Sequence, residues 1–457
     1  MEANLYLRNA KVTSEDAQFL GGILVRDGLI SEVVDGNPDL PAEKTIDLRG
    51  HILFPGIIDS HVHFNDPGRT HWEGMRTGSM AAAAGGVTTI VDMPLNNLPA
   101  VVNQEILQSK LDAVKSRALV DFALYGGLID DNLVELEGMH RSGVAAFKAF
   151  LSNSAIPDFP RVDDDIFMIG LQQISDLGNL LVIHAENEYV PSYLVKKFQA
   201  EGRCDRAAWT ESRPPYVELE AIQRALFWLR QVGGRLHILH TTLSEGVELV
   251  YQAKMDGLEV SVETCPHYLT FNEDDFERIG PVAKCAPPLR SRDEVESLWD
   301  VVLEGKVDTI GSDHSPCTFE EKQAGDEDIW KAWGGISGVQ TMLVTILTEG
   351  VHKRGLPLTS VTRMLSSNPA RTMGLYPGKG SFLPGSDADF TVVDLDDEWT
   401  LNEKDLHYKN PHSPFVGRSF KGRVVQTILR GKTVYQEGAF PIEPGYGCFL
   451  PRGFDKV

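Results

Sequence analysis

The sequence lacks the features of several protein classes. Acidic residues outnumber basic ones by 65 to 43, and the resulting net charge of −22 repels nucleic-acid backbones and anionic membrane surfaces. No run of 18 apolar residues is present, so no membrane span is expected, and the opening residues MEANLYLRNAKV do not resemble a secretory signal. The sequence therefore predicts a soluble cytoplasmic protein that binds neither nucleic acid nor membranes.

Cysteines are few, and common catalytic signatures are missing. The 457 residues include five scattered cysteines and no CxxC pair, which favours free thiols in a reducing compartment. The glycines around 334–338 and 431–433 have the spacing of neither a dinucleotide-binding nor a phosphate-binding loop. No HExxH helix or GxSxG elbow is present either. The chemistry must therefore be sought in other residues.

Apolar segments alternate with segments of helical periodicity through the middle of the chain. Helical stretches are expected near 77–86, 103–117, 217–234 and 245–257, and several end in glycine just before the next apolar segment. Eight buried parallel strands separated by helices predict an α/β fold, a (β/α)8 barrel of the TIM type. The predicted strands are 56–64, 87–95, 121–129, 144–150, 180–187, 235–242, 258–269 and 307–315.

Both ends of the chain are rich in short strands separated by turns, with no helices between them. Such strands cannot extend a barrel. We therefore predict a small β-sandwich built from residues 1–52 and 376–457, with the catalytic barrel of residues 53–375 inserted between them. Within the barrel, the polar stretch 320–328 is expected to be a solvated loop.

Five ligand-type side chains fall at the carboxyl ends of predicted barrel strands. His61 and His63 lie two residues apart on one strand, so both imidazoles point to the same face. His184, His240 and Asp313 end three further strands, and barrel enzymes build their active sites at this rim. A single strand histidine is more often structural, but five such residues at one rim are not a chance arrangement. Imidazoles and a carboxylate suit Zn²⁺ and similar divalent ions, so the sequence predicts a metal site.

Lys148 lies in the apolar segment VAAFKAF of a predicted buried strand. A charged lysine is costly there unless it pairs with a carboxylate or reaches the strand end. Burial can instead lower its pKa and expose a free amine, which can take up CO₂ to form a carbamate that bridges two metals. The residues alone leave these alternatives open. Cys317, close in sequence to Asp313, is either a reactive thiol or, as we favour, a buried packing residue.

With these residues placed, the chain resembles the amidohydrolase superfamily and, within it, the cyclic amidases: dihydroorotases, hydantoinases and allantoinases. The resemblance runs from PGIIDSHVHF through FKAF, HAEN, HTTLSEG, ETCPHYL, APPLR and GSDHSP to SDADFTVVD. It implies the barrel and sandwich described above, and two divalent metal ions per subunit, with Zn²⁺ favoured over Co²⁺ or Mn²⁺. It also implies that His61, His63 and Asp313 bind the more buried metal, that His184 and His240 bind the second, and that Lys148, carboxylated by CO₂, bridges both.

Three places distinguish the members of this branch. Asn65 stands where dihydroorotases have the arginine that pairs with the substrate carboxylate, and Asn153 stands where hydantoinases have a tyrosine aimed at the ring. Segments 66–74 and 331–335 closely resemble allantoinases. The resemblance therefore implies that the substrate is allantoin, whose hydantoin ring is opened to give allantoate in purine catabolism. The substrate contacts that it implies are Asn65, Asn153, Ala286 and Gly335.

The resemblance also implies a proton carrier and an assembly. Asp313 is expected to accept the proton of the attacking water and to return it to the leaving ring nitrogen. The family suggests a homotetramer. Two alternatives stay open: a hydantoinase or dihydropyrimidinase of broad ring specificity, which would share every metal ligand, and a non-catalytic scaffold on the same fold, which would have lost some of them.

Overall fold

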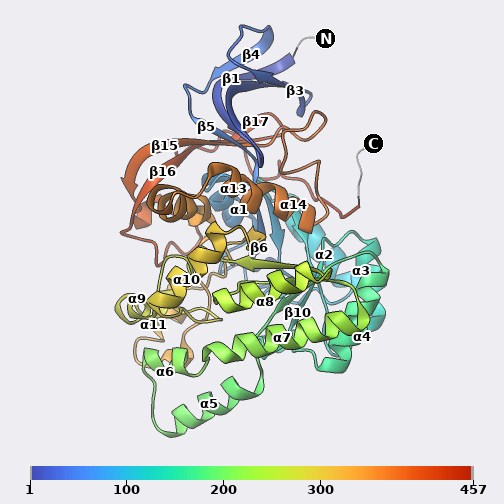
Figure 1. Ribbon diagram of the computed structural model, residues 1–457, viewed down its shortest axis with the longest axis vertical. Helices are drawn as coiled ribbons and strands as arrows, with labels where there is room; N and C mark the ends of the chain where they lie inside the picture. The colour runs from blue at the N-terminus through green and yellow to red at the C-terminus, as the bar shows by residue number, and fades with distance from the viewer. Residues whose placement is uncertain (1–2, 454–457) are drawn as a thin grey trace.

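The computed structural model describes residues 3–453, and each of the eight predicted barrel strands is present (Figure 1). The third strand is interrupted at Tyr125, so that two labelled strands are its halves. The barrel strands are β6 (Ile57–Val62), β7 (Val87–Asp92), β8 (Asp121–Leu124) with β9 (Gly126–Gly127), β10 (Phe147–Phe150), β11 (Leu181–His184), β12 (Arg235–Ile238), β13 (Glu259–Thr264) and β14 (Thr309–Ile310).

The barrel closes because its last strand returns to its first. Strands β6, β7 and β8 pair in parallel, as do β9 to β14 in chain order. The backbone N–H of Ala145, just before β10, donates to the carbonyl of Leu124 in β8 (2.9 Å) and so connects the two sets. A parallel bridge between Val62 and His314 joins the two ends of the array. The predicted α/β barrel is thereby confirmed.

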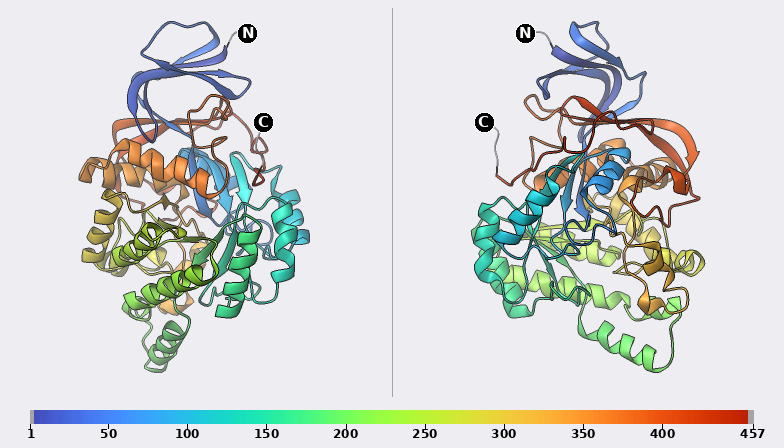
Figure 2. Two further views of the ribbon diagram at one scale, coloured as in Figure 1. Left: turned by 45° about the vertical axis from the view of Figure 1, so that its right-hand side comes forward. Right: turned by 180° about the vertical axis from the view of Figure 1, so that it is seen from behind.

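Helices surround the barrel, as two further views show (Figure 2). The four predicted helical stretches correspond to α1, α2, α7 and α8. The helices are α1 (Met75–Ala84), α2 (Gln104–Val114), α3 (Leu136–Arg141), α4 (Asp164–Asp176), α5 (Tyr189–Ala200), α6 (Arg206–Glu211), α7 (Pro215–Val232), α8 (Ser244–Met255), α9 (Glu273–Ile279), α10 (Arg292–Leu303), α11 (Phe319–Gln323), α12 (Met342–Thr345), α13 (Leu358–Thr362) and α14 (Asn368–Thr372).

Local sequence fixes where these helices begin. The Asn103 side chain accepts the backbone N–H of Ile106 (2.9 Å) and caps α2. Proline at the first position of α7 needs no hydrogen-bond partner there. Among the described residues no helix is both long and apolar enough to cross a membrane.

Only the second half of residues 320–328 forms the solvated loop that their polarity suggested. The first part of this stretch belongs to α11, which Thr318 caps. Its hydroxyl accepts the backbone N–H of Glu321 (3.3 Å), and the Glu321 carboxylate accepts the N–H of Thr318 (2.9 Å). This Thr-x-x-Glu capping box is a helix-start signal that the sequence does contain. One turn further on, Lys322 is buried.

The strands from the two ends of the chain form one sheet above the barrel in Figure 1. The sheet order is β17-β16-β15-β5-β1-β2-β3, with β4 paired to β1. Strand β5 pairs with β1 in parallel and with β15 antiparallel, so it connects the two ends. These strands are β1 (Ala3–Thr13), β2 (Gln18–Arg26), β3 (Leu29–Asp35), β4 (Ala42–Asp47), β5 (Ile52–Pro55), β15 (Phe390–Thr400), β16 (Ser419–Leu429) and β17 (Lys432–Gln436).

This sheet has an apolar core of its own. Leu7, Ile23 and Leu53 from the first part of the chain pack in one cluster with Phe390 and Ile428 from the last part. Neither end could bury these side chains alone, which is why both are needed to complete the subdomain. The boundaries 1–52, 53–375 and 376–457 stay a prediction.

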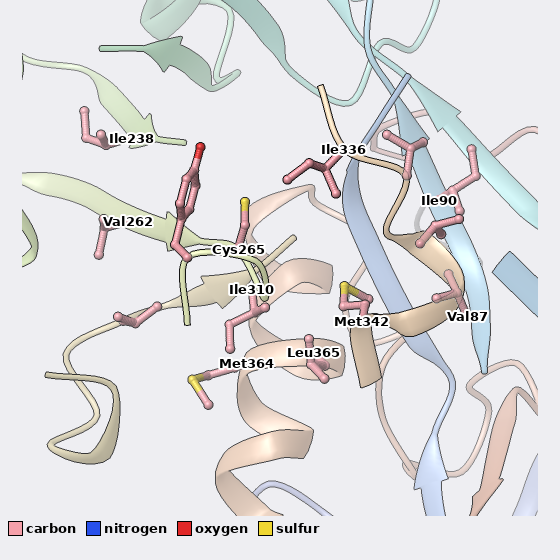
Figure 3. Packing of buried hydrophobic residues seen from close by; sticks show 14 of the residues in the cluster. Val87, Ile90, Ile238, Val262, Cys265, Ile310, Ile336, Met342, Met364 and Leu365 are labelled. Carbon is pink, nitrogen blue, oxygen red and sulfur yellow. The ribbon is translucent and has the colours of Figure 1, made fainter. Parts of the chain in front are cut away.

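The barrel strands are buried on both sides. Figure 3 shows Ile238, Val262 and Ile310 from three successive strands, with Met364 and Leu365 of the helical segment Arg363–Ser367 packed close by. Such strands read as continuous apolar runs and not as alternating ones. That property made them recognisable in the sequence.

A buried lysine connects the sheet to the barrel. Lys379 Nζ lies 2.6 Å from Asp121, at the start of β8, 2.6 Å from Asp389, just before β15, and 2.9 Å from Asp387. Arg430 also pairs with Asp121. The three carboxylates would repel one another in this apolar setting without the ammonium between them.

We expect Lys379→Met to lower the free energy of unfolding by about 3–5 kcal/mol, because it leaves buried carboxylates without their cation. Chemical denaturation of the variant and the wild type measures this. Lys44→Met, which changes an exposed lysine on β4, is the matched control. Equal stability of the two variants would contradict the proposed role of Lys379.

Candidate metal centre

The structure brings the six predicted ligands to one cavity at the carboxyl ends of the barrel strands. The cavity has a volume of about 640 Å³. Its lining includes side chains from β6, β10 and β11 and from the segments that follow β12 and β14. The six are His61, His63, Lys148, His184, His240 and Asp313.

Two histidines and an aspartate form the first donor group. His61 Nε2 lies 3.2 Å and His63 Nε2 lies 3.4 Å from Asp313 Oδ1. All three side chains are buried, and their donor atoms lie within 4.8 Å of one another. Two imidazole nitrogens and a carboxylate oxygen at this spacing are a fitting donor set for a divalent cation.

A buried carboxylate orients His61 from behind. Glu263 Oε1 lies 2.7 Å from His61 Nδ1. Burial opposes ionisation of Glu263, but His61 and His237 hold its pKa at about 2. A ring that donates to Glu263 through Nδ1 turns the lone pair of Nε2 toward Asp313. The Nε2 lone pair and the Asp313 carboxylate are both acceptors, and a cation bound between them would stabilise this arrangement. Gly311 leaves the room for this pair, since a Cβ there would lie 2.5 Å from Glu263 Oε2.

His184 and His240 form the second donor group. His184 Nδ1 and His240 Nε2 face each other at 3.0 Å. The Glu186 carboxylate accepts from His184 Nε2 (2.7 Å), which leaves the lone pair of the other ring nitrogen, Nδ1, directed at His240. His240 Nδ1 is buried without a hydrogen-bond partner. Two ring nitrogens that converge in this way fit a shared metal ion.

Burial sets the charge state of these groups. It lowers the pKa of His63 and His184, and it lowers the pKa of His240 well below its usual value. Burial would raise the pKa of Asp313, but the surrounding histidines hold it well below its usual range. At neutral pH these three histidines are therefore neutral and Asp313 is ionised, which are the forms that bind cations.

Lys148 is buried without a carboxylate partner. Within residues 3–453 no carboxylate oxygen lies at ion-pair distance from its Nζ, which instead lies 4.6 Å from the centre of the Phe150 ring. Burial lowers its pKa to about 7. The salt-bridge alternative considered for this residue is thus not realised, and a substantial fraction of free amine is present at neutral pH.

Two of the ligand positions have left-handed backbone. His240 has a φ of 37° and Asp313 a φ of 45°. Such a conformation costs a non-glycine residue on the order of 1–3 kcal/mol, and it persists where the surroundings require it. It turns both side chains into the cavity just beyond the ends of β12 and β14.

The four predicted substrate contacts are placed differently. Asn153 and Ala286 line the cavity, whereas Asn65 and Gly335 do not. The Asn65 side-chain amide is buried without a hydrogen-bond partner. The lining includes instead Gly334, which precedes Gly335, and Asn96, whose amide lies 3.1 Å from His63 Nδ1.

Several residues that orient the ligand histidines or line the cavity were not predicted from the sequence. Glu263 and Glu186 orient ligand histidines, and the Asn96 amide lies 3.1 Å from His63 Nδ1. Glu186 follows a ligand by two residues, and that position was an available signal. Glu263 lies in the middle of the predicted strand 258–269, and only the observed end of β13 at Thr264 places it at the rim. Arg213 and Trp209, which also line the cavity, gave none.

Cys317 is buried, and its Sγ lies 3.3 Å from the carbonyl of Thr318. Burial raises its pKa to about 11. The thiolate is therefore scarce at neutral pH, which favours a packing role. All five cysteines are free thiols.

This fold and donor set match a known family. A family model described as the amidohydrolase family matches residues 52–434. The chain belongs to the amidohydrolase family and is a hydrolase. Membership and the donor group of His61, His63 and Asp313 together support a divalent metal site in this cavity.

Individual relatives give a narrower comparison than the family model does. The chain is 49% identical to an allantoinase of Rubrobacter xylanophilus over 416 residues, which cover 91% of this chain and 90% of that protein. It is 41% identical to an allantoinase of Deinococcus radiodurans over 452 residues, or 99% and 100% of the two. Among solved structures, the L-hydantoinase (dihydropyrimidinase) from Arthrobacter aurescens has a TM-score of 0.96 at 37% identity, covering 98% of this chain and 100% of that one.

Proposed function

We propose that this enzyme opens the hydantoin ring of allantoin by hydrolysis to give allantoate. The observation that carries the proposal is that proteins named allantoinase are 38–49% identical to this chain over 91–99% of its length. A buried rim of ligand-type side chains around one cavity supports it, because hydrolysis of an amide needs an activated water and a proton carrier.

Hydrolysis of other cyclic amides is the second candidate. It is favoured by the likeness to a protein titled L-hydantoinase (dihydropyrimidinase). Asn153 argues for allantoin, because a polar amide stands where hydantoinases carry a ring-facing tyrosine. A non-catalytic scaffold is disfavoured, because all six ligand-type side chains are kept.

The proposed cofactor is a pair of divalent ions, Zn²⁺ or alternatively Co²⁺ or Mn²⁺. His61, His63 and Asp313 would hold one ion, and His184 and His240 the other. Lys148, after its amine has added CO₂ and released a proton, would bridge both through the carbamate oxygens. When bound, such ions supply Lewis-acid polarisation of the ring carbonyl and lower the pKa of water.

Asp313 is proposed to carry the proton. Its pKa lies well below the usual range, so it is ionised and able to accept a proton when the water attacks. The same carboxyl then returns the proton to the ring nitrogen as the C–N bond breaks. Asn153 and Ala286 are proposed to contact the ring from the cavity wall, with Asn65 and Gly335 acting from behind that wall.

We infer that the enzyme is a cytoplasmic homotetramer with a small-molecule substrate and no nucleic-acid partner. The acidic net charge and the free cysteines support the location, and the family resemblance supports the assembly.

The substrate is tested with a panel of allantoin, hydantoin, dihydrouracil and dihydroorotate on enzyme of measured metal content. We expect the highest kcat/KM for allantoin and essentially no turnover of dihydroorotate, because no arginine stands at position 65 to pair with its carboxylate. A site built for polar contacts loses affinity when they are left unpaired, which penalises unsubstituted rings. Faster hydrolysis of hydantoin or dihydrouracil would overturn the proposal in favour of the second candidate.

We expect Lys148→Ala to lose both metal and activity, and short carboxylic acids to restore part of each. Wild-type enzyme given ¹³C-labelled bicarbonate should show one carbamate signal, which the variant lacks. Lys110 serves as an internal control, because this buried lysine pairs with Asp92 at 2.7 Å and should not form a carbamate with CO₂. Full metal content in Lys148→Ala would contradict the assignment.

We expect Asp313→Asn to keep much of its metal, because the amide oxygen can still coordinate, but to lose turnover by a factor of about 10²–10⁴. Metal analysis alongside steady-state kinetics separates the two effects. Asp130→Asn, at an exposed position, is the control. A loss below roughly tenfold would mean that another group carries the proton.

A further inference from the structure

The segment 329–335 crosses one wall of the cavity. Residues 330–334 all line it, and the only regular structure in the segment is the short turn Ile329–Lys331. A wall without strand or helix needs some other support if it is to hold a substrate in one position. Two buried lysines supply this support.

Lys284 and Lys322 hold the segment by its backbone carbonyls. Lys284 Nζ donates to Ile329 (2.7 Å) and Ala332 (2.6 Å). Lys322 Nζ donates to Trp333 (2.9 Å), to Gly335 (2.5 Å) and to the carbonyl of Lys284 itself (3.1 Å). The three protons of the Lys322 ammonium are therefore all used.

Both lysines are at most 2% exposed, and within residues 3–453 neither pairs with a carboxylate. Burial lowers the pKa of both amines, that of Lys322 to about 8. A buried amine without a countercharge is costly, and it is kept where its hydrogen bonds fix something useful. Here they fix the backbone on both sides of Trp333.

Trp333 is the side chain that this arrangement presents. Its ring is partly buried, lines the cavity, and lies 4.7 Å from the ring of the buried Trp72. Its indole N–H donates to the carbonyl of Ser315 (3.3 Å), two residues beyond Asp313. Arg69 lies 5.0 Å from the Trp72 ring and supports it further. The indole is thus attached to the segment that bears the proposed proton carrier.

The other two indoles of the wall are already engaged elsewhere. Arg213 and Lys284 lie 3.6 and 3.9 Å from the centre of the Trp209 ring. The Trp330 N–H donates to the carbonyl of Arg203 (2.8 Å), outside the cavity lining. Trp333 differs in its partner, because its N–H contacts Ser315, two residues beyond Asp313, so its ring is the one tied to the segment of the proposed proton carrier.

We propose that Trp333 is a specificity-determining residue that packs against the planar ureido arm of the substrate, and that Lys284 and Lys322 are the residues that position it. A ureido group is flat and neutral, so it can lie on an indole face, whereas a ring without the arm has nothing to place there. This inference rests on the proposed function, because it assumes a substrate that bears such an arm.

The experiment compares kcat/KM for allantoin with kcat/KM for hydantoin, which lacks the arm. In Trp333→Leu the ratio should fall about threefold to tenfold relative to wild type, mainly through a higher KM for allantoin. Trp333→Phe keeps an aromatic face and should keep most of the ratio. Trp330→Leu, a change of the same kind in the same segment, should leave the ratio within about twofold.

Lys322→Met tests the positioning role, with Lys44→Met, at an exposed lysine outside the cavity lining, as its control. The first should lower the ratio as Trp333→Leu does, with metal content unchanged, and the second should not. If Trp333→Leu and Lys322→Met lower kcat/KM equally for allantoin and for hydantoin, the inference is overturned and these residues have a structural role. If either variant fails to fold, Lys284→Met decides, because this lysine also holds the segment by its carbonyls. A ratio that falls in Lys284→Met while Trp333→Phe keeps it supports the inference, and an unchanged ratio in Lys284→Met would overturn it.

Failure of the proposed function would be visible in the wild-type enzyme alone, as a higher kcat/KM for hydantoin than for allantoin. The change of ratio between wild type and variant reports on Trp333 whichever substrate the wild type prefers.

Discussion

The site depends on one contact, the closure of the barrel between its first and last strands. The backbone N–H of His63 donates to the carbonyl of His314 at 2.8 Å, next to the parallel bridge of Val62 with His314. Asp59 strengthens the closure, because its carboxylate accepts the backbone N–H groups of His61 (3.2 Å) and Ser312 (3.0 Å). Residues some 250 positions apart in the sequence thereby become neighbours. Without closure, His61 and His63 would not share the Asp313 carboxylate.

The buried lysines among residues 3–453 are of two kinds. Lys379 and Lys110 pair with buried carboxylates, and they stabilise the fold as ordinary cations. Lys148, Lys284 and Lys322 are buried beside the cavity without such partners within residues 3–453, and burial lowers the pKa of each. Unpaired buried amines are rare because they cost free energy, and their gathering at one cavity distinguishes that cavity from the rest of the molecule. The unpaired lysines lower the stability of the fold at the site, while the paired lysines elsewhere stabilise it.

Much of the fold was predictable, for a physical reason. Strands covered on both faces are continuous apolar runs, so the eight barrel strands could be recognised one by one. The rim position of the ligands followed from the rule that parallel strands end at one edge. Polarity was misleading at 320–323, where a capping box begins a helix in spite of the charged composition and Lys322 is buried. Substrate contacts were harder to predict, since Asn65 and Gly335 lie outside the cavity lining although His63 and Gly334 belong to it.

The sequence by itself determined the barrel, the strand-rich ends and the ligand-type residues, because each of these is written in local periodicity and in residue type. The tertiary structure alone decided which carboxylates stand behind which imidazoles, as Glu263 does for His61 and Glu186 for His184. It also decided that Lys148 has no ion-pair partner within residues 3–453, and that two lysines hold the wall that carries Trp333. Pairings of this kind depend on distances between side chains from separate strands and loops, and no local pattern encodes such distances.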